Sequence, residues 1–260
     1  MTARLLDILE ARNGIVCAVG AGGKKTTLYR LATAHPSRVG LTASVTTIPV
    51  PEQYRDQDVV LPPDLVRDAV MAATDARRIA FAASSDKPGC RGGLPPALIA
   101  DIHRAAALDA TYVKADGARM RWIKAPDDHE PQVPPGTTTV IPIVSACVFA
   151  QPLSDKIAHR PDRIAALTGA VLGEPLTPIH VARLLSHSHG ALCGSDDATV
   201  VPVINMIDNE TLEAAAIETA RSALSLSNHF VSVVLTRTIA DDPIVLVIGD
   251  QATISSRVAK

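Results

Sequence analysis

The amino-acid sequence predicts a doubly wound α/β fold with a mainly parallel sheet, formed as a single domain over residues 1–260. Short apolar runs of strand length alternate with segments of helical periodicity along the whole chain. No internal repeat and no linker interrupts this alternation. A glycine-rich stretch between the first apolar run and the next helix indicates where a ligand would bind.

The predicted elements follow from apolar patterns bounded by glycine, proline and asparagine. Leucines at positions 5, 6 and 9 form the apolar stripe of a first helix, and the helix that follows the glycine stretch ends at His35, before Pro36. Strands are expected at residues 15–19, 39–47, 78–83, 111–115, 138–145, 199–204, 230–235 and 244–248. Further helices are expected at residues 64–74, 96–108, 163–168 and 212–224.

Composition favours a globular protein with no nucleic-acid partner. Hydrophobic residues make up 47% of the chain and charged residues 20%, which excludes a disordered chain. The formal net charge is −2 and aromatic residues are 3%, so neither a basic surface nor base stacking is indicated.

The sequence also predicts a cytoplasmic protein without a membrane segment. The longest apolar stretch, residues 140–150, contains Pro142 and is too short to span a bilayer, and the amino terminus does not resemble a signal peptide. The cysteines, at positions 17, 90, 147 and 193, are far apart, as expected of reduced thiols.

The stretch IVCAVGAGGKKTTLYRLA, residues 15–32, has the order of a phosphate-binding loop: strand, glycines, lysine, helix. Glycines let backbone N–H groups turn inward, the helix N-terminus adds partial positive charge, and a lysine reaches the outer phosphates. The alternative is a tight strand-to-helix turn that needs glycine only for its geometry. The predicted nucleotide-binding residues are Gly20, Ala21, Gly22, Gly23, Lys24, Lys25, Thr26 and Thr27.

The loop departs from the pattern G-x-x-x-x-G-K-S/T of phosphate-loop NTPases. With Lys24 as the phosphate lysine, Ala18 replaces the first glycine and Lys25 replaces the hydroxyl residue. With Lys25 in that role, Thr26 supplies the hydroxyl but Lys24 replaces the preceding glycine. Because that hydroxyl binds the magnesium bridging the phosphates, phosphate binding is better supported than hydrolysis. The dinucleotide fingerprint G-x-G-x-x-G fits less well, because its third glycine falls on Lys25 and the acidic residue after the second strand is missing.

Asp116 is the second candidate residue, because it follows a predicted buried strand at residues 111–115. Ligands of parallel sheets collect at the carboxyl ends of the strands, where an aspartate coordinates magnesium in phosphate-loop proteins. Lys24 and Asp116 are therefore the predicted catalytic residues, and Thr26 and Asp116 the predicted Mg²⁺ ligands. The alternative for Asp116 is a turn begun by Asp-Gly.

Two loops carry further candidates. The proline-rich stretch at residues 124–136 suggests a lid or substrate contact, with His129 and Glu130 available for acid–base work, or a solvated connection. Lys124, and Arg119 just before it, belong to the same predicted substrate loop. The loop at residues 87–95 has glycines and basic residues suited to an anion, or is a surface turn.

The stretch Asn205–Met206–Ile207–Asp208 resembles the base-binding N-K-x-D of guanine-binding proteins, with Met206 in place of lysine, so the choice of base stays open. Asn205 and Asp208 complete the predicted nucleotide site. The histidines at positions 180, 187 and 189 have no acidic or cysteine partner at ligand spacing, which favours helix and loop positions over a metal site.

Taken together, these motifs resemble the YqeC family, accessory proteins associated with selenium-dependent molybdenum hydroxylases. The resemblance depends on VGAGGKKTTLYRLA, VTT at 45–47, ADGAR at 115–119, KAP at 124–126, HEP at 129–131, HR at 159–160 and the N-x-x-D that ends at Asp208. It implies a phosphate-loop nucleotide-binding fold and a role in maturing a molybdenum hydroxylase or supplying its cofactor. Lys25, Lys114 and Met206 depart from the family pattern at the nucleotide site.

Two functions are consistent with these features. One is a slow, magnesium-dependent nucleoside triphosphatase that uses ATP or GTP. The other is a non-hydrolysing carrier of a phosphorylated cofactor such as a molybdopterin nucleotide. Lys25 is the residue that separates them, because a lysine at the hydroxyl position supplies charge but no metal ligand.

Overall fold

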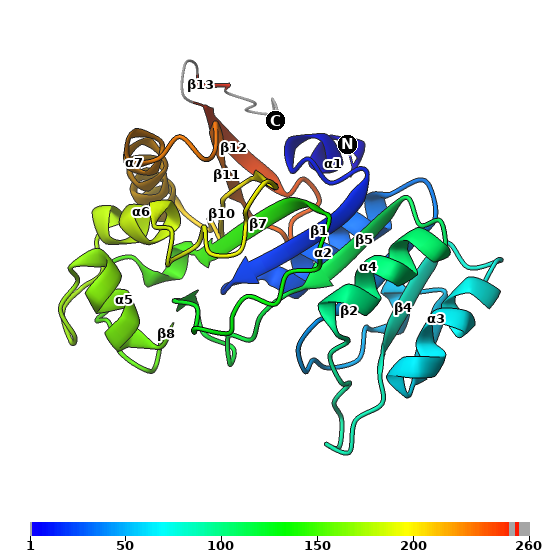
Figure 1. The fold of residues 1–260 in the computed structure, drawn as a ribbon. Coiled ribbons are helices and arrows are strands. Elements are labelled where there is room, and N and C mark those ends of the chain that lie inside the picture. The colour runs from blue at the N-terminus through cyan, green and yellow to red at the C-terminus, as the bar shows by residue number, and fades with distance from the viewer. Residues whose placement is uncertain (1, 250–252, 255–260) are drawn as a thin grey trace.

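One long sheet crosses the molecule, in a computed structural model that describes residues 2–249 and 253–254 (Figure 1). Neighbouring strands from β3 to β11 are parallel, and only β12 and β13 are antiparallel. In order across the sheet, the strands are β13 (Thr253–Ile254), β12 (Ile244–Gly249), β11 (Ser232–Thr236), β10 (Val203–Asn205), β7 (Thr137–Ser145), β1 (Gly14–Gly20), β5 (Ala110–Lys114), β2 (Val39–Ala43), β4 (Arg78–Ala83) and β3 (Gln57–Leu61), with β9 (Thr199–Val200) beside β7. The predicted mixed α/β class with a mostly parallel sheet is confirmed.

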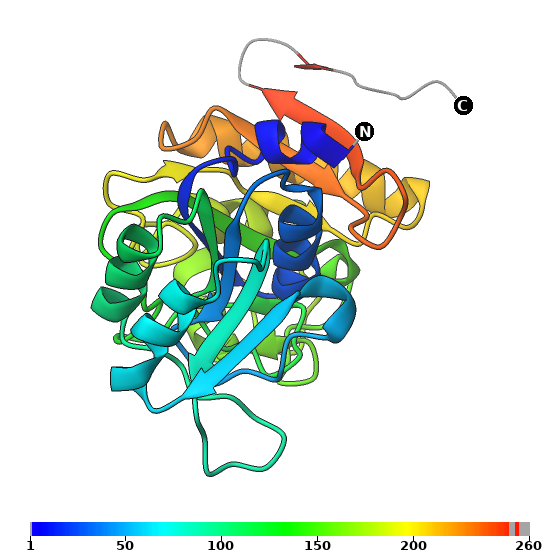
Figure 2. The ribbon, with the colours of Figure 1, turned by 90° about the vertical axis from the view of Figure 1, so that its right-hand side faces the viewer.

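Helices cover both faces of the sheet. Helices α1 (Thr2–Ile8) and α2 (Lys24–Ala34) pack on the face that carries Val16 and Ala18 of β1. Helices α3 (Pro63–Ala72) and α4 (Pro96–Ala105) pack on the opposite face, against Cys17 and Val19. Helices α5 (Pro161–Thr168), α6 (Pro178–Ser186) and α7 (Glu210–Leu226) extend that second layer over β7, β10 and β11. Figure 2 shows α1 beside β12, where their apolar side chains share one core.

Smaller elements lie outside the main sheet. A two-stranded parallel ladder joins β6 (Ile123–Lys124) to β8 (Ala158–His159), and single 3₁₀ turns form η1 (Glu52–Tyr54) and η2 (Ala146–Val148). Within the residues described, no helix has the length and apolar character that crossing a bilayer requires.

Differences from the expected elements have local causes. The strand expected at 39–47 stops at Ala43, because the chain then leaves the sheet and Thr47 bridges to Arg91. The strand expected at 199–204 is two strands, because Pro202 has no N–H to continue the ladder. Strand β3 was not expected; it lies at the edge of the sheet, where only Val59 of its five residues is buried. Helix α6 was also not expected, although Thr177 and Pro178 form a helix start.

Tyr112 connects the central strand β5 to the chain before β1, and its replacement by phenylalanine should lower stability. The buried hydroxyl donates to the carbonyl of Ala11 at 2.9 Å. Loss of this bond should reduce the free energy of unfolding by about 1 kcal/mol, measured by urea denaturation. Tyr29→Phe is the control, because its hydroxyl has no hydrogen bond among the described residues. An equal loss in both variants would contradict the role of Tyr112.

Candidate phosphate-binding site

The glycine loop is short and is packed against the strands on one side of β1. Strand β1 ends at Gly20 and α2 begins at Lys24, so only residues 21–23 connect them. Gly22 and Gly23 have φ angles of 91° and 131°, which disfavour other residues. A Cβ on Gly22 would lie 2.5 Å from the backbone nitrogen of Ser145, and one on Gly23 would lie 2.2 Å from Nδ2 of Asn205. These glycines are therefore required by both backbone conformation and close packing.

The loop presents unused hydrogen-bond donors. The backbone N–H groups of Gly22 and Gly23 have no hydrogen-bond acceptor among the described residues. The N–H of Ala21, by contrast, donates to the carbonyl of Ile143. The N–H groups of the first turn of α2 have no partner within the helix, and this turn contains no acidic side chain. Donors at a helix N-terminus attract an anion.

Asp116 lies directly behind the loop, because β5 is the neighbour of β1 in the sheet. Its Oδ2 accepts from the N–H of Gly20 at 2.9 Å, and its Oδ1 lies 2.6 Å from Nζ of Lys24. Nζ of Lys24 also donates to the carbonyl of Gly20. Asp116 is 2% exposed and Lys24 is 6% exposed, so this ion pair is almost entirely buried.

The Lys24–Asp116 pair is one end of a chain of ion pairs, which we call the Asp116 network. Lys124 lies 2.9 Å from Asp116 and 2.7 Å from Glu130, and Glu130 lies 2.8 Å from Arg160. Its members are Lys24, Asp116, Lys124, Glu130 and Arg160. The glycine loop, the Ala-Asp-Gly turn, the proline-rich loop and the β8–α5 junction therefore meet at one set of charges, buried at Lys24, Asp116 and Lys124 and half-buried at Glu130 and Arg160.

Burial and neighbouring charges determine the protonation of this network. Burial lowers the pKa of Lys24, the charge of Asp116 opposes that shift, and the charge of Lys124 adds to it. For Glu130, burial alone would raise the pKa, but Lys124 and Arg160 more than offset it and the pKa is below its usual value. Glu130 is therefore held as a carboxylate.

Lys25 and Lys114 add positive charge that no carboxylate balances. Neither lysine has an ion pair in the described part of the chain, and Nζ of Lys114 donates only to the carbonyl of Thr46, at 3.1 Å. Burial, together with the charges of Lys24, Lys25 and Lys124, lowers the pKa of Lys114 to about 8 against the opposing charge of Asp116. An anion bound here would relieve this repulsion.

The other predicted site residues divide into two groups. Lys124 and Glu130 of the expected substrate loop enter the Asp116 network, whereas Arg119 and His129 are exposed and outside it. Thr26 is half-buried with no side-chain hydrogen bond among the described residues, and the hydroxyl of Thr27 donates to the carbonyl of Gly23. The acid–base and metal roles expected of these residues stay predictions.

Asn205 and Asp208 do not lie in equivalent surroundings. The buried Asn205 donates through Nδ2 to the carbonyl of Gly22 at 2.8 Å, and its Oδ1 accepts from Thr236 and Thr238. Asp208 is exposed. Asn205 thus connects the glycine loop to the end of β11, and its role in base recognition is a prediction that this geometry leaves untested.

Sequence reasoning did not identify Arg160 as a site residue, and it placed Lys114 at the site only through the departure from the family pattern. Arg160 closes the Asp116 network and Lys114 faces the loop from β5. The HR pair at 159–160 was the available signal for Arg160. For Lys114 the signal was a charged residue at the end of an otherwise apolar strand.

The residues present do not fit a magnesium ion at Asp116. Each carboxylate oxygen of Asp116 lies within 3 Å of a lysine ammonium, Lys24 on one side and Lys124 on the other. A divalent cation there would be repelled by both. Among the described residues, no three His, Cys, Asp or Glu side chains form a group that could hold a metal.

Comparisons with known proteins agree with the motifs that meet at this site. The family model described as "YqeC protein" matches residues 16–162, which contain every member of the Asp116 network. The chain belongs to the YqeC family. An uncharacterized YqeC protein of Escherichia coli (strain K12) is 27% identical over 194 residues, which cover 73% of this chain and 75% of that protein. No solved structure matches.

Glu130→Gln should reveal the stabilising charge of the network through its pH dependence. Because the pKa of Glu130 is lowered in the folded state, its contribution is complete above the usual value of 4.5 and is lost as pH falls through the folded value. The variant should lose about 1–3 kcal/mol of unfolding free energy at pH 7, and this difference should shrink in acid.

Urea denaturation between pH 7 and pH 3 measures this difference. Glu218→Gln is the control, because Glu218 is exposed on α7 and has no ion pair among the described residues. A difference from the parent protein that stays constant with pH would exclude the charge as its origin.

Proposed function

We propose that this YqeC-family protein binds a phosphorylated ligand, a nucleotide or a nucleotide-bearing cofactor, at the glycine loop. The observation that carries the proposal is that the N–H groups of Gly22 and Gly23 have no acceptor within the described part of the chain and lie next to the buried Lys24 at the N-terminus of α2. Backbone donors and a lysine in this arrangement suit the oxygens of a terminal phosphate.

The Asp116 network supplies the charge balance for such binding. With no ligand, Lys24 is neutralised by Asp116; a bound phosphate would share the ammonium of Lys24. Asp116 would then keep its contacts with Lys124 and with the N–H of Gly20. No carboxylate is left without a cation in either state, which keeps the cost of binding low.

Membership of the YqeC family suggests a cellular role. We propose that the ligand is used in maturing a molybdenum hydroxylase or in supplying its cofactor. A non-hydrolysing carrier of a phosphorylated cofactor is the alternative to a nucleoside triphosphatase. The lysines around Asp116 and at position 25 favour the carrier, because cations already occupy the surroundings that a metal would need.

Lys24→Met should weaken phosphate binding whether or not magnesium is present. Loss of the charge-assisted contact, roughly 1.5–3 kcal/mol, corresponds to a decrease in affinity of about 10- to 150-fold. Calorimetric titration with pyrophosphate, ATP and GTP, each with Mg²⁺ and with EDTA, measures it. Lys156→Met is the control, because Lys156 is exposed and has no ion pair among the described residues. Unchanged affinity would refute the loop assignment, and binding that vanishes in EDTA would restore the predicted metal.

Turnover of ATP or GTP by the unaltered protein should be slow or absent. Lys25 stands at the position of the hydroxyl residue, and the Thr26 hydroxyl has no hydrogen bond among the residues that the structure describes. Lys25→Thr should raise magnesium-dependent phosphate release if the missing hydroxyl is what limits the reaction. Phosphate release is measured for both proteins with and without Mg²⁺. Rapid release by the unaltered protein that Lys25→Thr leaves unchanged would assign the metal-binding hydroxyl to Thr26.

A further inference from the structure

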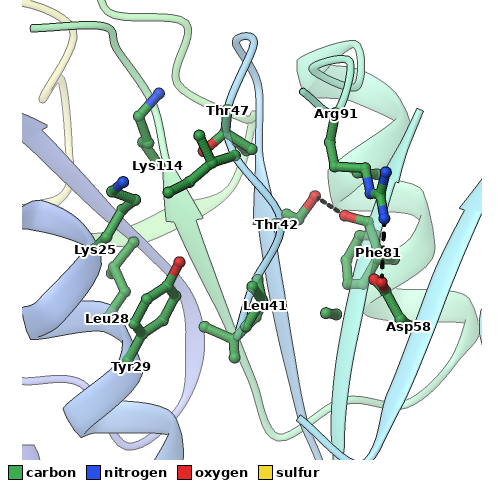
Figure 3. Close-up of a pocket in the computed structure, with 15 residues that line it drawn as sticks. Lys25, Leu28, Tyr29, Leu41, Thr42, Thr47, Asp58, Phe81, Arg91 and Lys114 are labelled. Carbon is green, nitrogen blue, oxygen red and sulfur yellow. Dashed lines mark hydrogen bonds and ion pairs between the residues drawn. The ribbon is translucent and has the colours of Figure 1, made fainter. Parts of the chain in front are cut away.

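A pocket that is partly open to solvent lies beside the glycine loop (Figure 3). It lies between the first turns of α2, the strands β2 and β4, and the segment that follows β2. The part between α2 and the sheet is apolar and is formed by Leu28, Leu41, Ala80 and Phe81. No residue of this pocket except Lys25 belongs to the phosphate loop described above.

The charges of the pocket are unevenly distributed. Figure 3 shows the side chains of Lys25 and Lys114 on one side and Arg91 with Asp58 on the opposite side. Arg91 lies 3.6 Å from Asp58, a carboxylate that it shares with Arg55. Lys25 and Lys114 have no such partner among the described residues. The pocket therefore combines an apolar interior with a positive side next to the glycine loop.

We propose that this pocket binds a second ligand, a phosphate monoester with a flat apolar body, whose phosphate lies between Lys25 and Lys114. A phosphate monoester carries close to two negative charges near neutral pH, whereas a carboxylate carries one. Two ammonium groups therefore bind the phosphate more strongly than they bind a single carboxylate. The apolar side chains bury the body of the ligand, and Tyr29 is held beside it by stacking on Tyr54, with ring centroids 4.7 Å apart. The inference rests on the proposed function, because the phosphate of this second ligand would lie next to the phosphate bound at the glycine loop.

The location of the pocket agrees with a role as a second substrate or cargo site. It lies toward the carboxyl ends of parallel strands, on the side of the glycine loop away from Asn205. Lys25 lies between the pocket and the glycine loop, because its backbone is in the first turn of α2 and its side chain lines the pocket. A ligand here would therefore be next to the terminal phosphate of one bound at the loop.

The test compares phenyl phosphate with inorganic phosphate by calorimetric titration. Burial of the ring should make phenyl phosphate bind at least about tenfold more tightly. Thr47→Trp should remove that preference by filling the pocket, while its neighbour Thr46→Trp should keep it, since Thr47 lines the pocket and Thr46 is exposed. Lys114→Met should weaken phenyl phosphate binding about tenfold or more, and Lys156→Met should not.

Two further measurements separate this inference from the proposed function. Pyrophosphate binding that depends on Lys24 should persist in Thr47→Trp, so that loss of the pocket and loss of the loop are distinguishable. Benzoate in place of phenyl phosphate tests the phosphate itself, and its binding should be weaker. Equal affinity for phenyl and inorganic phosphate, a preference that survives Thr47→Trp, or tighter binding of benzoate would each overturn the inference. Thermal unfolding verifies that each variant is folded.

Discussion

The buried carboxylate of Asp116 is the interaction on which the site depends. A carboxylate removed from water needs cations and hydrogen-bond donors close by, and Asp116 obtains them from Lys24, Lys124 and the N–H of Gly20. These partners come from the glycine loop and from the segment after β5. Satisfying one charge therefore fixes the position of the loop and of the β6 strand, and Glu130 and Arg160 extend the same constraint to α5.

The sequence was most informative where one local pattern determines the structure. Continuous apolar runs identified β1, β4, β7 and β12, because strands buried on both faces read this way. The glycines at 20, 22 and 23 identified the loop. By contrast, the ion pair between Lys124 and Asp116, and the role of Arg160, depend on which strand ends meet in space. Neither the spacing nor the type of these residues predicts that they lie next to one another in the folded chain.

The lysines at the site act in opposite ways on folding and on binding. Lys24 and Lys124 are paired with carboxylates, whereas Lys25 and Lys114 repel each other, and Lys114 is half-buried. Unpaired buried charge lowers the stability of the folded state. Under the proposed function, an anion bound beside the glycine loop would remove a repulsion that is present in the folded protein.

The bond from Asn205 to Gly22 joins residues 183 positions apart in the chain. Asn205 is in turn held by Thr236 and Thr238, so the loop near the amino terminus is completed by the last third of the sequence. Contacts of such long range form late, because a large loop of chain must close first. During synthesis the nascent chain would thus carry the whole glycine motif long before it had a finished loop. The geometry on which the proposed ligand binding depends would be complete only once β10 and β11 have formed, late in folding.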